Sequence, residues 1–388
     1  MDDLAERRTG QQRWAVTDLP AFPGRTVLSR LQPLAWLVVP VAIAVVSRGF
    51  SAALVELATR HIREVGPLLT IYRNPLVAWD GQWYLSIAAN GYHAQPLQPG
   101  PLGGHHDFAF FPVWPMLIRI ASLAWPRVDI VAVVLANVLF IAAAVVIWRL
   151  FEARYGARVA TGGVALLAFS PAAYVFSMAY SESAFLLLAG TYLAARASPG
   201  RRVLSAWLAM LTRIAGVGVL AAAAVRAVVS RGEERRTALT VVATSLIAFA
   251  AWWVVIALIT GDPMGFMRGS PAWVKTSGYG SILDAVRRPN PESVIQLGYP
   301  ALLLLGSLLV LRRDVELGVY ALAVTLLGAL PGGLIPSMPR YALLAFPAFA
   351  AISERLGRRG TVVLVLVFAV AQWFFVGWAF TGRHPLAP

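Results

Sequence analysis

Long uncharged stretches alternate with short arginine-rich segments along the whole chain. Uncharged runs near the ~20 residues that a helix needs to cross a bilayer occupy residues 130–148, 159–181, 237–261, 293–311, 317–339 and 360–382. Shorter or interrupted runs lie at 31–55, which contains Arg48, at 183–195 and at 341–353. The pattern predicts an all-α integral membrane protein with about nine full spans.

Two apolar segments do not fit the pattern of a simple span. The segment 203–229 has arginine clusters at both ends and Arg213 in its middle. Because non-helical backbone at membrane depth must be buried in protein or line a cavity, we predict a re-entrant pair of half-helices there. The segment 108–126 is interrupted by Pro112 and Pro115, and we predict an amphipathic helix on the outer face of the membrane.

The arginine clusters set the expected orientation, because cytoplasmic loops carry an excess of basic residues. The five clusters are Arg149/Arg154/Arg158, Arg196/Arg201/Arg202, Arg226/Arg231/Arg235/Arg236, Arg312/Arg313 and Arg355/Arg358/Arg359. With these clusters inside, we expect a plasma-membrane protein with a cytoplasmic tail, residues 1–30, and a single transmembrane domain, residues 31–388. The segments then expected on the outer side are the two large loops, 56–127 and 261–291, the short turns 178–182 and 331–340, and the C-terminal tail.

Composition supports a membrane protein and excludes several classes of function. Of all residues, 58% are hydrophobic and only 13% are charged, which is too apolar for a soluble domain. The net charge is +14, but the basic residues lie between apolar runs, which indicates contact with anionic lipid rather than with nucleic acid. The absence of cysteine excludes disulfides and thiolate metal sites. Lys275 is the sole lysine, and this preference for arginine suggests a bacterial source.

The stretch NPLVAWDGQWYLSIAANGYH places one carboxylate, Asp80, among aromatic residues just outside the first predicted span. Ionisable groups against apolar segments are costly, so they indicate function. Trp79, Trp83 and Ile87 recur at i, i+4 spacing and predict a short amphipathic helix. Asp80 is either the N-cap of this helix, which accepts hydrogen bonds from backbone N–H groups of the first turn, or a general base at the membrane surface.

Four further ionisable residues each allow two interpretations. Glu182 either complements the dipole of the helix that it begins or faces Asp80 as a second carboxylate that holds an acceptor or a metal. Arg213 and Arg340 either reach toward lipid headgroups or bind a phosphate with both guanidinium arms. Lys275 is either a solvated loop residue or another phosphate contact.

Metal and nucleotide sites are not indicated. His105, His106 and Asp107 are adjacent in a glycine-containing loop and lack the spacing of a preformed metal site. No Walker or Rossmann glycine motif occurs in the chain. We therefore expect a reaction that needs neither a nucleotide donor nor a metal cofactor.

Several motifs together resemble the PIG-V-type, GPI mannosyltransferase 2 family. They are WDGQWYLSIAANGY (79–92), FAFFPVWPMLIR (108–119), FSPAAYVFSMAYSESAFLL (169–187), LTRIAG (211–216) and PRYALLAFPAF (339–349). The resemblance implies a GT-C fold and a polyprenyl- or dolichyl-phosphate sugar as donor. The acid of the family's first outer loop corresponds to Asp80, its Ser-Glu pair to Ser181 and Glu182, and its later arginines to Arg213 and Arg340.

We accordingly predict a GT-C-type membrane mannosyltransferase that inverts the anomeric centre and works on the outer face. Asp80 is the predicted general base, and Arg340 with Arg213 or Lys275 is predicted to stabilise the departing lipid phosphate. The residues predicted to bind substrate are Trp79, Gln82, Trp83, Tyr84, His93, Ser181 and Glu182. Because GPI is eukaryotic, a bacterial member must use another glycan or glycolipid acceptor.

Two other classes of protein share these features. A lipid-linked-sugar transporter, or flippase, also has many spans and intramembrane arginines, but inverted repeats are the usual pattern of such transporters and none is visible in the sequence. A catalytically inactive accessory subunit that binds the same lipid is the second alternative. Net transfer of sugar by the purified protein distinguishes the enzyme from both.

Overall fold

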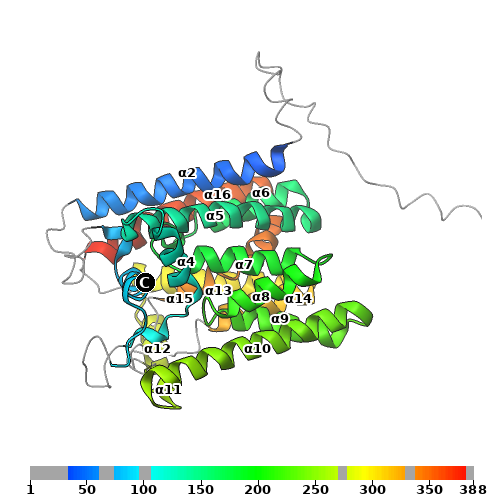
Figure 1. The fold of residues 1–388 in the computed structure, drawn as a ribbon. Helices are drawn as coiled ribbons and strands as arrows, with labels where there is room; N and C mark the ends of the chain where they lie inside the picture. Colours follow the sequence, from blue (N-terminus) through cyan, green and yellow to red (C-terminus); the bar gives the residue numbers. More distant parts are fainter. Residues whose placement is uncertain (1–33, 61–73, 96–105, 270–277, 328–336, 382–388) are drawn as a thin grey trace, which may run out of the picture.

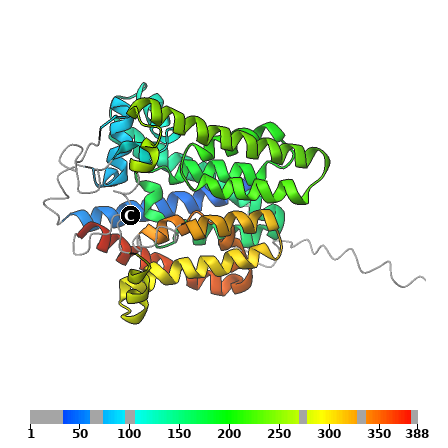
Figure 2. The ribbon, with the colours of Figure 1, turned by 90° about the horizontal axis from the view of Figure 1, so that it is seen from below.

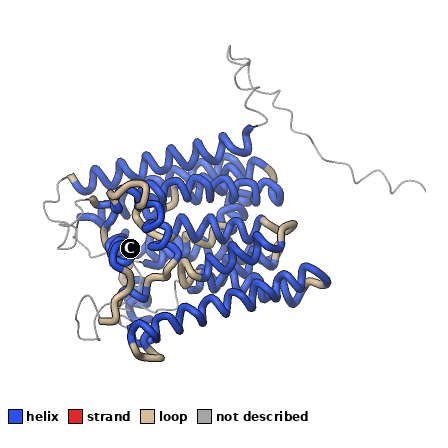
Figure 3. Tube along the Cα trace, in the orientation of Figure 1, coloured by secondary structure: helices blue, strands red, loops and turns tan. Residues whose placement is uncertain are grey.

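Helices and their connections make up the described structure (Figure 1, Figure 3). A computed structural model describes residues 34–60, 74–95, 106–269, 278–327 and 337–381, which contain α-helices and short 3-10 helices but no strand. The predicted all-α class is therefore confirmed. Lys275 and His105 lie outside the described residues.

Five helices in this part of the chain are long and apolar enough to cross a membrane. They are α2 (Ala35–Thr59), α5 (Val128–Tyr155), α10 (Gly232–Thr260), α13 (Pro291–Leu311) and α16 (Pro347–Thr381). Figure 1 shows α2, α5 and α10 with roughly aligned axes. α2 continues through Arg48, and α16 consists of two helical segments that meet at Gly357, where φ is 65°. The protein is thus a multi-pass membrane protein, and the number of nine spans stays a prediction.

Shorter helices fill the space between the long ones. They are α6 (Ala157–Ala168), α7 (Glu182–Ala194), α8 (Pro199–Met210), α9 (Gly216–Val229), α14 (Val315–Leu327) and α15 (Met338–Ala342). Apart from the five-residue α15, each has 12 to 14 residues, so it is about 18–21 Å long and shorter than the roughly 30 Å hydrocarbon core. The predicted pair of half-helices in 203–229 is confirmed as α8 and α9.

The prediction of one uninterrupted span over 159–181 was wrong, whereas the span over 317–339 stays a prediction. α6 ends at Ala168, two residues before Ser170-Pro171, and irregular backbone with the 3-10 helix η5 (Ala173–Ser177) follows. A residue before proline is pushed away from helical geometry, so an uncharged run can still contain a helix end. In the run 317–339, α14 is described as far as Leu327, and residues 328–336 lie outside the described residues.

The buried Arg48 of α2 holds this interruption in place. Its Nη2 donates to the carbonyl oxygen of Ala168 at 3.0 Å, and its Nη1 donates to that of Ala173 at 2.6 Å. The guanidinium also lies 4.5 Å from the ring centre of Phe140. Carbonyl groups at a helix end need outside donors, so Arg48 supplies them where no water reaches and fixes the segment that leads to Glu182.

The predicted arginine clusters gather at one end of the bundle. Ion pairs join Arg154 and Arg196 to Asp314, Arg202 to Glu316, and Arg313 to Glu354. Figures 1 and 2 show α3 (Asp80–Asn90), α4 (Val113–Ser122), α11 (Gly265–Gly269) and α12 (Gly278–Arg287) at the other end. α4 has ten residues, too few to cross a bilayer. The arginine clusters and these four helices therefore lie at opposite ends of the described structure, and the predicted inner and outer sides stay a prediction.

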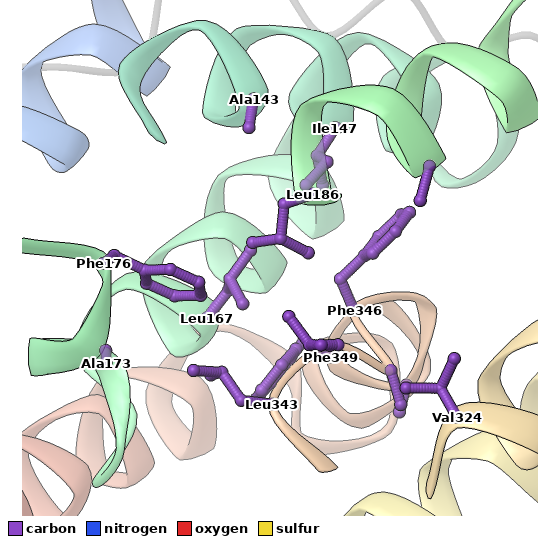
Figure 4. Close-up of a cluster of buried hydrophobic side chains, with 14 of the residues drawn as sticks. Ala143, Ile147, Leu167, Ala173, Phe176, Leu186, Val324, Leu343, Phe346 and Phe349 are labelled. Carbon is purple, nitrogen blue, oxygen red and sulfur yellow. The ribbon is translucent and has the colours of Figure 1, made fainter. Parts of the chain in front are cut away.

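An apolar core joins the long and short helices. Figure 4 shows Leu343, Phe346 and Phe349 packed beneath Leu167 and Leu186, so residues from α6, α7 and the region of α15 and α16 meet there. α9 and α14 approach so closely that Cγ2 of Val324 leaves no room for a Cβ on Gly218. This dense packing lies beside the first turn of α9, close to the turn that joins α8 and α9.

Candidate active site

Four charged side chains meet where the short helices begin or end. Glu182 is the first residue of α7, and Arg213 lies in the turn between α8 and α9. Arg340 belongs to α15, and Asp80 is the first residue of α3. Where a helix is interrupted inside a bundle, some backbone groups lack helical hydrogen bonds and polar side chains can lie beside them. These interruptions bring ionisable residues together within an apolar fold.

The four side chains form a chain of alternating charge. Nη1 of Arg340 lies 2.6 Å from Oδ2 of Asp80, and its Nε donates to Oε1 of Glu182. The same Oε1 is 2.9 Å from Nη1 of Arg213. Two cations thus balance two anions in the order Asp80, Arg340, Glu182, Arg213.

Two hydroxyl groups connect this chain back to α3. Nη1 of Arg213 donates to Oγ of Ser181 at 2.8 Å, and the same oxygen lies 2.8 Å from the hydroxyl of Tyr84. Tyr84 is one helical turn beyond Asp80 on α3. The cluster therefore closes on the helix that carries the predicted base.

Burial distinguishes Asp80 from the other charged groups. The side chains of Glu182, Arg340 and Arg213 are 0%, 5% and 7% exposed, whereas that of Asp80 is 23% exposed. Glu182 lies in a continuous buried segment, because every residue from 170 to 186 is buried, and its predicted place on the outer side stays a prediction. Buried charges are tolerated when they are paired, and Asp80 is the member of the chain that solvent or a substrate reaches.

A strained turn aims the Asp80 carboxylate. The N–H of Gly81 donates to the carbonyl oxygen of Ala78 at 3.2 Å, which closes a four-residue turn. Trp79 has φ 53° and ψ −116°, the values of the second position in a type II′ turn, where glycine is usual. Among the described residues Trp79 is the single non-glycine residue with positive φ. Such conformations cost on the order of 1–3 kcal/mol and cluster at functional sites.

The N-cap interpretation of Asp80 is wrong. Trp79 occupies the capping position of α3, and no side chain caps that helix. The Asp80 carboxylate is instead directed to Arg340. A long-range partner has thus replaced the local hydrogen bonds that the sequence allowed.

The segment before Glu182 holds this turn. The N–H of Ala179 donates to the carbonyl oxygen of Leu76 at 2.8 Å, and the hydroxyl of Tyr180 donates to that of Ala78 at 3.1 Å. A Cβ on Gly81 would lie 3.3 Å from Cβ of Ala179, so the two segments are in close contact. The Tyr180 ring centre is 4.3 Å from the Arg340 guanidinium. One loop therefore positions Asp80, Arg340 and Glu182 together.

Two of the three aromatic residues that were predicted to bind substrate are buried and pack against another ring. Trp83 and Tyr84 are buried, with ring centres 5.8 Å and 5.0 Å from that of Phe110. Trp79 is half-buried, 4.8 Å from the ring of Phe380. Of the three rings, only that of Trp79 keeps intermediate exposure beside Asp80. The predicted substrate residue Gln82 is also buried on α3.

His93 lies apart from the charged cluster. It follows the end of α3, and the helix's 11 residues make it about 16 Å long. Its backbone N–H and Nδ1 lie 3.0 Å and 2.8 Å from Oδ2 of the buried Asp107. Sequence reasoning treated Asp107 as part of a possible metal triplet and gave no signal for this pairing. Within the described ranges, no group of three or more histidine, aspartate or glutamate residues could hold a metal ion.

Comparisons with known proteins find relatives of the same kind as the sequence motifs indicated. A curated relative, GPI mannosyltransferase 2 of Drosophila pseudoobscura pseudoobscura, is 30% identical over 118 residues, which are 28% of this chain and 24% of that protein. The match thus spans about a quarter of the relative's length.

Solved structures to which the chain is similar include the Archaeoglobus fulgidus oligosaccharyltransferase in complex with Zn and sulfate. The two are 12% identical with a TM-score of 0.49, over 86% of this chain and 52% of that one. The archaeal oligosaccharyltransferase AglB from the same organism, in complex with an inhibitory peptide and a dolichol-phosphate, is 14% identical with a TM-score of 0.48, over 87% and 55% of the two chains.

A match to a protein family shows to which family the chain belongs. The family described as "Mannosyltransferase (PIG-V)" matches residues 26–233, more than half of the chain. This range contains Asp80, Ser181, Glu182 and Arg213, four members of the cluster described above. The chain belongs to the PIG-V mannosyltransferase family.

Proposed function

We propose that this protein is an inverting GT-C-type mannosyltransferase that moves mannose from a polyprenyl-phosphate donor to a hydroxyl of a glycan or glycolipid on the outer face of the plasma membrane. The observation that carries the proposal is the Asp80–Arg340 contact of 2.6 Å in a cluster of otherwise buried charges. It places a carboxylate that can accept a proton next to a guanidinium that can bind a phosphate. Family membership supports the sugar, and the apolar fold supports a lipid-linked donor.

The reaction is a single displacement at the anomeric carbon. Asp80 takes the proton of the acceptor hydroxyl as its oxygen attacks the anomeric carbon of mannose. The bond between that carbon and the phosphate oxygen breaks, and the polyprenyl phosphate leaves with the electron pair. Arg340 offsets the charge that develops on this phosphate, and a preorganised cation at such a position can be the largest contribution to the rate.

Glu182 is assigned to position the arginines rather than to act as a base. Its carboxylate is fully buried, and it contacts both Arg340 and Arg213 through Oε1. Arg213 also donates to Oγ of Ser181, so its guanidinium is held beside the Glu182 carboxylate that Arg340 shares. Two guanidinium groups then provide the positive charge at the leaving phosphate, and we propose that no cofactor or added metal is required.

Transfer by the purified protein tests the proposal. The full chain in detergent is incubated with polyprenyl-phosphate [14C]mannose and candidate acceptors, and labelled product is separated from donor. Transfer supports an enzyme, whereas a flippase needs two leaflets and an inactive subunit transfers nothing. The Asp80→Asn variant should lose transfer and remain folded, while Asp284→Asn, at an exposed position of α12, should keep it. An active Asp80→Asn variant would contradict the assignment of the base.

A further inference from the structure

The proposed base and the proposed phosphate-binding residue neutralise each other. Oδ2 of Asp80 lies 2.6 Å from Nη1 of Arg340. The Asp80 oxygen that contacts the guanidinium is occupied, so it does not receive the proton of an acceptor hydroxyl while the pair is closed. A guanidinium nitrogen that already binds a carboxylate must exchange it to bind a phosphate. The contact thus brings the two groups together, but while it is closed neither is available for its proposed role.

Charge balance shows that an added phosphate requires a change in the cluster. Asp80, Glu182, Arg213 and Arg340 sum to zero net charge in the observed pairing. A polyprenyl-phosphate sugar is a phosphodiester and adds one negative charge. Uncompensated charge in a buried site is costly, so a carboxylate has to move toward solvent as the phosphate arrives.

Asp80 is the carboxylate that can move. It is 23% exposed, lies at the start of α3, and has Arg340 as its ion-pair partner in the described structure. Glu182 is fully buried, is held by two guanidinium groups, and begins a helix within a continuous buried segment. Moving Glu182 would break two buried ion pairs, whereas moving Asp80 breaks one pair at the edge of the cluster.

We propose that the Asp80–Arg340 ion pair is a latch that the donor opens, an inference that rests on the proposed function. The donor phosphate replaces the Asp80 carboxylate on Arg340, and Asp80 becomes a competent base only after the donor is in place. No covalent bond changes in this exchange, since one anion substitutes for another on the same guanidinium. The acceptor hydroxyl is then deprotonated only when the anomeric carbon that it attacks is present.

The same exchange in reverse assists release of the product. After transfer, Asp80 holds the proton of the acceptor and is neutral, while the polyprenyl phosphate has become a monoester and has gained a second negative charge beside Arg340. When Asp80 loses this proton to solvent, its carboxylate again competes for Nη1 of Arg340 and displaces the lipid phosphate. Each cycle therefore starts and ends with the pair observed here.

Donor affinity tests the latch directly. The dissociation constant of polyprenyl-phosphate mannose is measured by microscale thermophoresis on the full chain in detergent, without acceptor. Asp80→Asn removes the competing carboxylate, so we expect it to bind the donor about tenfold more tightly than the wild type, a change of about 1.4 kcal/mol. Asp80→Ser, which also lacks the carboxylate, should show the same tightening. Equal or weaker binding by both variants overturns the latch.

Matched variants separate the latch from a general effect of charge. Glu182→Gln also removes one negative charge from the cluster, but it removes the group that holds both arginines, so we expect donor binding that is weaker than in the wild type. Tightening by Glu182→Gln equal to that of Asp80→Asn would overturn a specific latch. Asp284→Asn should leave donor affinity unchanged, because Asp284 is exposed on α12.

Parallel transfer assays distinguish failure of the latch from failure of the proposed function. If the wild type transfers mannose and the Asp80 variants do not bind donor more tightly, the latch is wrong and the enzyme assignment stands. If the wild type neither binds the donor nor transfers mannose, both proposals fail. Tighter binding together with lost transfer in Asp80→Asn supports both.

Discussion

Replacing Glu182 by alanine should destabilise the protein more than removal of any exposed acid. Glu182 is fully buried, and Oε1 contacts the guanidinium groups of both Arg213 and Arg340. Its loss leaves Arg213 without this carboxylate and removes the anion shared by the two guanidinium groups in an apolar surrounding. Breaking a buried pair by removing one partner costs about 3–5 kcal/mol, much of it from the charge left behind.

A surface pair gives the matched control. Glu56 and Arg60 form an i, i+4 pair with side chains 64% and 60% exposed. Such helix pairs contribute about 0.3–0.5 kcal/mol, so Glu56→Ala should be almost neutral. The two effects therefore differ by nearly an order of magnitude for the same chemical change.

Unfolding by sodium dodecyl sulfate in mixed micelles, followed by tryptophan fluorescence, measures both variants against the wild type. The double variant Glu182→Ala/Arg213→Ala should be less destabilised than the sum of its single variants, because removal of Arg213 removes one uncompensated cation. If Glu182→Ala costs no more than Glu56→Ala, the ion-pair chain is not a buried structural unit and the reasoning is refuted.

Three further predictions address other parts of the site. Arg340→Lys should lower kcat/KM for mannose transfer by roughly 10²-fold, the loss typical of one charge-stabilising donor. The reason is that one ammonium group does not replace a guanidinium that contacts Asp80 and Glu182 together. Initial rates at several donor concentrations measure this change. Arg48→Met should reduce the free energy of unfolding by about 1–3 kcal/mol per buried carbonyl left without a donor, as judged in the same micelle titration, and a neutral result would contradict the role of Arg48 at the end of α6. Treatment with EDTA should leave transfer unchanged, and a loss that added divalent ions restore would show that the arginines do not suffice.

Local sequence pattern identified the members of the cluster but not their pairing. Asp80, Glu182, Arg213 and Arg340 stood out because ionisable groups are rare in apolar segments. The sequence interpretation directed the arginines to a lipid phosphate, whereas the structure pairs them with the protein's own carboxylates. Contacts between positions 158 residues apart, such as Arg340 and Glu182, leave no signature in local periodicity.

Helix interruptions were the second feature that hydrophobic pattern could not resolve. The run 159–181 is uniformly uncharged, and length alone predicts a span. Pro171 was the available signal that the helix ends early. The donor that makes this end tolerable, Arg48, lies on another helix, and it was first interpreted only as an interruption of its own span.

These interruptions explain how a very apolar chain holds four charges without unfolding. Glu182, Arg213 and Arg340 each lie at a helix start, a turn or a five-residue helix, so each is attached to backbone that leaves the regular helical path inside the bundle. On uninterrupted spans, their side chains would have to approach from separate helix faces across packed apolar groups. Short helices instead deliver the ends of three elements to one place, and the paired charges compensate one another there. Asp80 joins from a fourth element at the exposed edge, which makes it the one charge that can change partner without opening the bundle.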